Sequence, residues 1–401
     1  MPTAPDDRPT PAAEASVWRA PGIPALLVMV AAGFAGYALL MPVAPMWAAQ
    51  GGADATGVGL VTGVFMFATV AVQLSVPSLL RRLGWAFVLS AGLVLLGAPA
   101  LLHLLSDALW FVLALAAVRG AGFAILTVAG SSAIAELIEP PRRGRAIGAF
   151  GLAIAAPQVL LLPLAPWAAE HLGYPVVFLA ATAPVLGLVA AYRLGRRLDA
   201  LPQHPELQHP DLHRGLRRFA GLAPPVVLLL GVTLAGGAML TFVPQLTTDA
   251  VLAMAALLLL TGLAALTRWG AGHFADRYGP SGLLLPSVLS TVAGLSLCAW
   301  SAAGPGRAAA LLIGMALIGL SYGALQNLTL GMAFAAVPRR DQVTASAAWN
   351  IGFDLGTGVG AVIVGAIATG TGFPIALLAA ATISVLTVPM ALLRPRSPAA
   401  S

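Results

Sequence analysis

Two charged side chains lie near the middle of long apolar segments, where ionisable groups are rare. Arg119 lies in the segment 108–134 and Asp354 in the segment 343–369, at similar distances from the segment ends. A lone charge at such a position costs at least about 2.5 kcal/mol on insertion scales, so it normally faces water, a ligand or another charge. A carboxyl group there can bind and release a proton, and a guanidinium can bind an anion.

Each of these residues also has a purely structural interpretation. Arg119 could donate hydrogen bonds to backbone carbonyls across a helix contact. Asp354 could be permanently buried and hydrogen-bonded to Asn350, which precedes it by four positions and so shares its helical face. The sequence leaves both interpretations open.

Other polar and aromatic side chains inside apolar segments could line a binding cavity. Tyr322 and Gln326 are one helical turn apart, with Asn327 beside them, and give their segment a polar stripe. Such groups also serve simply as contacts between membrane helices. Aromatic side chains could form an apolar surface for a bulky ligand. The predicted cavity residues are Asn350, Tyr37, Phe34, Gln158, Tyr322, Gln326, Asn327 and Trp349.

The composition requires a lipid environment. Of 401 residues, 59% are hydrophobic and 9% are charged, and the mean hydropathy is +0.91. A soluble domain carries about 25% charged residues. The net charge is +6, but the arginines are scattered in short loops rather than gathered on one face, so we predict no nucleic-acid partner.

The sequence predicts neither a metal site nor a cofactor. The single cysteine, Cys298, lies in an apolar segment and excludes a disulfide or a thiolate metal site. Three histidines within 204–213 are interrupted by prolines, which disfavour a regular helix that could align them. No Gly-Lys-Ser/Thr phosphate loop occurs, so ATP is not expected to act directly.

Twelve apolar segments are long enough to cross about 30 Å of hydrocarbon. We predict an all-α membrane protein whose twelve transmembrane helices form two six-helix bundles related by a pseudo-two-fold axis. The predicted segments are 23–48, 57–79, 85–105, 108–134, 146–169, 174–194, 222–246, 250–271, 281–303, 308–335, 343–369 and 374–393.

Short basic motifs repeat between the two halves of the chain. Pro141-Arg142-Arg143 is repeated as Pro338-Arg339-Arg340, and Arg82-Leu83-Gly84 resembles Arg277-Tyr278-Gly279. This indicates two copies of one multi-span unit in parallel order. The predicted parts are a disordered cytoplasmic tail (1–20), an N-terminal bundle (21–195), a cytoplasmic linker (196–221), a C-terminal bundle (222–394) and a second cytoplasmic tail (395–401).

The arginines also predict the orientation. Basic residues in short loops stay on the cytoplasmic side. With a cytoplasmic N-terminus the outer loops contain only Arg307, while outer segments carry Asp54, Asp107, Glu170 and Asp249. We therefore expect both termini in the cytoplasm. All basic residues are Arg, which suggests a GC-rich bacterial genome and hence a bacterial inner membrane.

Gly272-His273-Phe274-Ala275-Asp276-Arg277-Tyr278-Gly279 resembles the Gly-x-x-x-Asp-Arg-x-Gly loop signature of the major facilitator superfamily. The segment Arg119-Gly120-Ala121-Gly122-Phe123 resembles that family's buried-arginine motif. The resemblance implies a role for Arg119 in proton movement or in holding a helix. It also implies a cytoplasmic gate formed by Gly272, Asp276, Arg277, Gly279, Arg81 and Arg82. The alternative role of this loop is a topological anchor.

Two departures from the family pattern concern its function. The first-half copy of the signature has Arg81 at the acidic position and Pro77 in place of the first glycine. In the fifth span, antiporters of the family carry a Gly-Pro pair, whereas this chain has Leu162-Pro163. The exporter motif is therefore incomplete.

Three classes of function follow from these features. The leading hypothesis is a secondary active transporter that works by alternating access, with proton-coupled efflux of a small amphipathic organic compound. The alternative is uptake or facilitated diffusion of a small anionic metabolite anchored by Arg119. An intramembrane aspartyl protease would need a second midspan carboxylate besides Asp354. The expected partners are a small-molecule substrate, protons and the lipid bilayer, and a monomer is expected to suffice.

Overall fold

The computed structural model describes residues 20–138, 143–201, 221–278, 281–338 and 341–392. Within these ranges every regular element is a helix, and twelve helical segments are long and apolar enough to cross a membrane. The predicted fold class is confirmed.

The first half of the chain supplies six spans, two of which are broken into shorter helices. Pro99 begins a new helix in the third span and Pro184 lies in a short helix of the sixth, because proline cannot donate to the preceding turn. The elements are α1 (Ile23–Gln50), α2 (Ala55–Gln73), α3 (Val76–Leu83), α4 (Trp85–Gly97), α5 (Pro99–Leu102), η3 (His103–Leu105), α6 (Leu109–Leu137), α7 (Arg143–His171), α8 (Tyr174–Ala180), α9 (Ala183–Leu186) and α10 (Leu188–Asp199).

The second half supplies six further spans, five of them continuous helices. Its elements are α11 (Ala223–Leu246), α12 (Ala250–Tyr278), α13 (Ser281–Ala302), α14 (Ala308–Ala335), α15 (Gln342–Thr371), α16 (Phe373–Val385) and α17 (Val388–Leu392).

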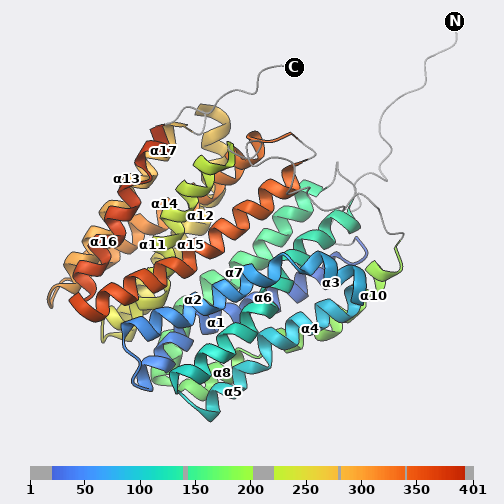
Figure 1. The fold of residues 1–401 in the computed structure, drawn as a ribbon, viewed down its shortest axis with the longest axis horizontal. Coiled ribbons are helices and arrows are strands. Elements are labelled where there is room, and N and C mark those ends of the chain that lie inside the picture. The colour runs from blue at the N-terminus through green and yellow to red at the C-terminus, as the bar shows by residue number, and fades with distance from the viewer. Residues whose placement is uncertain (1–19, 139–142, 202–220, 279–280, 339–340, 393–401) are drawn as a thin grey trace, which may run out of the picture.

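The helix contacts repeat between the halves. In the first half α1 packs on α7, α2 on α6 and α4 on α6. The second half has the same order, with α11 on α15, α12 on α14 and α13 on α14. Between the halves α2 packs on α15, and the equivalent pair, α12 and α7, also packs together. Figure 1 shows the blue-to-green first half beside the yellow-to-red second half, with α15 next to α2. A pseudo-two-fold axis between the halves produces this pattern, because it exchanges α2 with α12 and α15 with α7.

The sixth span extends beyond the predicted start of the linker at position 196. Helix α10 continues to Asp199, whose carboxylate accepts hydrogen bonds from the backbone N–H groups of Trp85 (2.7 Å) and Ala86 (3.1 Å). These N–H groups start α4 and have no partner within their own helix. The remainder of the linker, 202–220, and both predicted tails lie outside the described residues, apart from residue 20.

Candidate functional site

Arg119 joins three helices of the first half. It lies on α6 and is only 3% exposed. Its Nε donates to the carbonyl oxygen of Leu96 on α4 (3.2 Å), and its Nη2 donates to that of Gly36 on α1 (3.2 Å). The guanidinium carbon lies 5.6 Å from the centre of the Phe65 ring on α2. The contacts therefore match the structural interpretation of Arg119.

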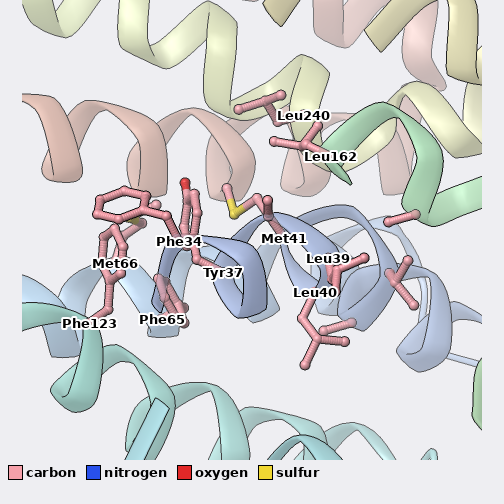
Figure 2. Close-up of a cluster of buried hydrophobic side chains, with 14 of the residues drawn as sticks. Phe34, Tyr37, Leu39, Leu40, Met41, Phe65, Met66, Phe123, Leu162 and Leu240 are labelled. Atoms are coloured by element: carbon pink, nitrogen blue, oxygen red, sulfur yellow. The ribbon is translucent and has the colours of Figure 1, made fainter. Parts of the chain in front are cut away.

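Four aromatic rings surround this region. Phe34 and Tyr37 come from α1, Phe65 from α2 and Phe123 from α6, and Figure 2 shows them gathered in one group. Tyr37 stacks on Phe123 with ring centres 4.5 Å apart, and Phe34 meets Phe123 edge-on at 5.4 Å. Phe34, predicted to line a cavity, is 5% exposed and packs in this group.

A cavity of about 20 Å³ lies beside Arg119. Tyr37, Thr62, His103 and Arg119 are among the residues that line it, and most of its wall is apolar. A volume of this size is enough for one water molecule. His103 is 1% exposed, and its Nδ1 lies 3.2 Å from the carbonyl oxygens of Pro99 and Ala100. His103 was not among the residues predicted from the sequence, although a histidine at the end of an apolar segment is a visible signal.

Asp354 forms a hydrogen bond between the two halves. It lies on α15, is 5% exposed, and its Oδ2 accepts from Nε2 of Gln73 on α2 at 2.7 Å. Gln73 is 7% exposed, and its Oε1 is buried without a hydrogen-bond partner among the described residues. A bond from an amide N–H to an ionised carboxylate is stronger than a neutral one. This contact therefore responds to the charge of Asp354.

The structural alternative for Asp354, a hydrogen bond to Asn350, is wrong in its partner. Asn350 is exposed, and its Nδ2 donates to the carbonyl oxygen of Ser346 in its own helix at 2.9 Å. The four-residue spacing places Asn350 and Asp354 near one face of α15. Asn350 nevertheless bonds to the backbone of its own helix, and Asp354 bonds to Gln73 of the first half.

Arg119 and Asp354 do not pair with each other. The guanidinium binds backbone carbonyls of its own half, and the carboxylate binds Gln73.

The predicted polar stripe on α14 binds an arginine of α12. Tyr322 and Gln326 are buried, and Gln326 Oε1 accepts a hydrogen bond from Nη1 of Arg268 at 3.1 Å. Asn327 Nδ2 donates to the backbone oxygen of Arg268 at 2.9 Å. Arg268 was not among the residues predicted from the sequence; its signal is a basic residue inside the predicted span 250–271 but close to its end.

Two other predicted cavity residues form hydrogen bonds within their own half of the chain. Trp349 is 5% exposed and its Nε1 donates to Thr329 Oγ1 at 3.0 Å, while its ring stacks on Phe353 with centres 5.7 Å apart. Gln158 is half-buried, and its Nε2 donates to the carbonyl oxygen of Ile154 in the same helix at 3.2 Å.

Comparison with protein families decides the identity of the fold. The sequence profile of the Major Facilitator Superfamily matches residues 26–303 and 247–401, which together include all twelve spans except the first three residues of the first one. The chain belongs to the Major Facilitator Superfamily. A comparison with curated protein sequences gives no significant match.

Solved structures of the superfamily share the fold at low sequence identity. A bacterial homolog of the human lysosomal transporter Spinster, in an inward-facing and unoccupied conformation, has a TM-score of 0.71 and 14% identity, covering 96% of this chain and 98% of that one. The nucleoside transporter NupG has a TM-score of 0.67 and 13% identity over 93% and 100%. A peptide transporter POT in complex with sulfate has a TM-score of 0.71 and 15% identity over 92% and 94%.

Membership of the Major Facilitator Superfamily makes this protein a multi-pass membrane transporter that works by alternating access. In this mechanism a central site opens to one side of the membrane at a time. We call the membrane face that carries loop 51–54 the loop side, and the face that carries residues 20 and 392 the terminal side.

In this structure of the superfamily member, contacts between the two halves close the loop side. Thr56, at the start of α2, donates its backbone N–H to Thr369 Oγ1 at the end of α15 (2.9 Å), and the two hydroxyls lie 2.8 Å apart. Nearer the centre, Thr62 and Thr241 are hydrogen-bonded at 2.8 Å between α2 and α11. At Gly59 an added methyl group would collide with the carbonyl oxygen of Ala361 on α15, so only glycine permits this approach.

The predicted gate lies on the terminal side and is described only in part. The side chain of Asp276 and the whole of Gly279 fall outside the described residues. Gly272 lies in α12 near Asn327 Nδ2, and Arg277 ends the same helix with an exposed side chain. In the first-half copy, Arg82 is exposed and Arg81 donates to Ser78 Oγ at 3.1 Å.

Proposed function

We propose that this transporter couples proton movement to the export of a small amphipathic organic compound, with Asp354 as the proton-binding group. The hydrogen bond between Asp354 and Gln73 carries the proposal, because it joins the two halves through a carboxylate buried within a span. Protonation removes the charge of Asp354 and weakens this bond. The balance between the two conformations then depends on proton occupancy.

The proposed setting is a bacterial inner membrane with both termini in the cytoplasm. With that orientation the loop side is the outer side, and the conformation closed there faces inward. We further propose that bundles 21–195 and 222–394 rock against each other as units, joined by the linker 196–221, and that one chain suffices. The gate at Gly272, Asp276, Arg277 and Gly279, with Arg81 and Arg82, would close the terminal side in the opposite conformation.

The direction of transport is tested in vesicles. Compounds that raise the thermal stability of the purified protein, from a panel of metabolites and antibiotics, are offered to inside-out vesicles with an acidic interior. Proton-driven accumulation there is the expected result and indicates export. Accumulation only in right-side-out vesicles under an inward proton gradient would instead establish uptake, the alternative function.

The proton-binding group is tested with Asp354→Asn in the same vesicles. The amide cannot ionise, so accumulation driven by the gradient is expected to fall to background while exchange of labelled for unlabelled compound continues. Asp341→Asn, near the start of α15, is the matched control and should keep gradient-driven accumulation. Normal accumulation by Asp354→Asn would show that another group couples the proton.

A further inference from the structure

Arg268 lies on the packed face of α12. Ala264, one helical turn before it, is 8% exposed, and Ala271, three residues after it, is 6% exposed. Residues spaced by three and four share one helical face. Arg268 is nevertheless an exposed residue. Its contact with Gln326 places the guanidinium on the side of α12 that faces α14, so a ligand between these helices could reach it.

The guanidinium of Arg268 keeps most of its hydrogen-bonding capacity. An arginine side chain has five N–H donors in a fork that fits a carboxylate. Among the described residues, one bond from this fork is recorded, Nη1 to Gln326 Oε1 at 3.1 Å. Arg119 differs, because its donors bind two backbone carbonyls and its side chain is 3% exposed.

An aromatic surface lies close to Arg268. Ala264, Tyr322 and Trp349 belong to one cluster of buried apolar residues, and Phe353 packs against that cluster. The Tyr322 and Phe353 ring centres are 6.0 Å apart, and Phe353 in turn stacks on Trp349. Phe353 is only half-buried. A ligand with a planar apolar body could lie against Phe353 while its charged end reaches α12.

We propose that Arg268, positioned by Gln326, binds the anionic group of the transported compound, which makes the substrate an amphipathic organic anion. The Tyr322, Trp349 and Phe353 rings receive its apolar part. This inference rests on the proposed transport function and specifies its substrate class. It also assigns the anion-binding role to Arg268 of the second half, whereas the sequence suggested Arg119 of the first half.

Binding measurements on the purified full-length protein test this assignment. Benzoate, 2-naphthoate and indole-3-acetate are each titrated against the wild type and Arg268→Gln in parallel with the corresponding uncharged amide. The wild type is expected to bind at least one acid about tenfold more tightly than its amide, because the guanidinium forms a charge-assisted bond with the carboxylate. Arg268→Gln should lose this preference and keep its affinity for the amide.

Arg193→Gln is the matched control, since Arg193 is exposed on α10 away from α12 and α14. It should keep the preference for the acid. The assignment is overturned if the wild type prefers no acid over its amide, or if the preference survives in Arg268→Gln.

If Arg268→Gln does not fold, Arg268→Lys decides: lysine keeps the charge but loses the fork, so acid binding should weaken while amide binding stays unchanged. Equal acid binding by Arg268→Lys and wild type would overturn the assignment.

The vesicle experiments separate this inference from the proposed function. Gradient-driven transport that depends on Asp354, without any preference for acids, overturns only the assignment of Arg268. A preference for acids that depends on Arg268, with normal gradient-driven transport by Asp354→Asn, overturns only the proton-coupling role.

Discussion

Arg119 and Arg268 place the same chemical group in two different surroundings. In the first half the guanidinium of Arg119 binds the carbonyl oxygens of α1 and α4 and lies 5.6 Å from the centre of the Phe65 ring. In the second half Arg268 is an exposed residue, and among the described residues its guanidinium has one hydrogen bond, to Gln326. The role of a membrane-embedded charge is thus decided by what its donors already bind. The arginine of the first half joins three helices, and we propose that the arginine of the second half binds the substrate.

The largest expected difference between the two arginines is in stability. Arg119→Met removes two charge-assisted hydrogen bonds, each contributing about 1.5–3 kcal/mol, and should lower the free energy of unfolding by about 3 kcal/mol or more. Arg268→Met removes one partly exposed bond and should cost about 1 kcal/mol. Thermal unfolding of both variants in the same detergent measures the difference. Equal losses would show that Arg119 does not have the structural role described above.

A smaller effect is expected at the contact between the halves. Gln73→Leu removes the hydrogen bond to Asp354 and should shift the conformational balance away from the state closed on the loop side by about tenfold. Labelling of Ala361→Cys with a membrane-impermeant maleimide reports opening of that side, because Ala361 is fully buried beside Gly59 in the closed conformation and Cys298 is buried as well. Gln158→Leu, whose amide bonds only its own helix, is the control. Unchanged labelling in Gln73→Leu would mean that the bond does not hold the halves together.

The smallest effect is expected at the water-sized cavity of the first half. His103→Gln keeps a polar side chain beside the carbonyls of Pro99 and Ala100 and should cost about 1 kcal/mol of stability. If the polar groups of the first half are structural, the pH profile of transport should be unchanged in this variant. A displaced pH profile would make His103 part of the proton pathway and would remove the contrast between the halves.

The fold could be predicted because span length, loop arginines and the duplication each depend on short stretches of sequence. Arg119 and Asp354 could be identified because a midspan charge is costly wherever it occurs. Their partners could not be identified in this way. Gln73 and Asp354 are 281 residues apart in sequence and meet only because α2 packs on α15. Local spacing instead suggested Asn350, which the helix backbone satisfies. Arg268 and His103 were missed because each lies near the end of its predicted span.

The bond between Gln73 and Asp354 makes the contact between the halves sensitive to one charge. A hydrogen bond to a charged group contributes about 1.5–3 kcal/mol, and one between neutral groups about 0.5–1.5 kcal/mol. If Asp354 takes up a proton as proposed, this contact weakens by about 1 kcal/mol, and a change of about 1.4 kcal/mol is tenfold in an equilibrium constant. A single proton would then change the ratio of the two conformations severalfold without any other contact being broken.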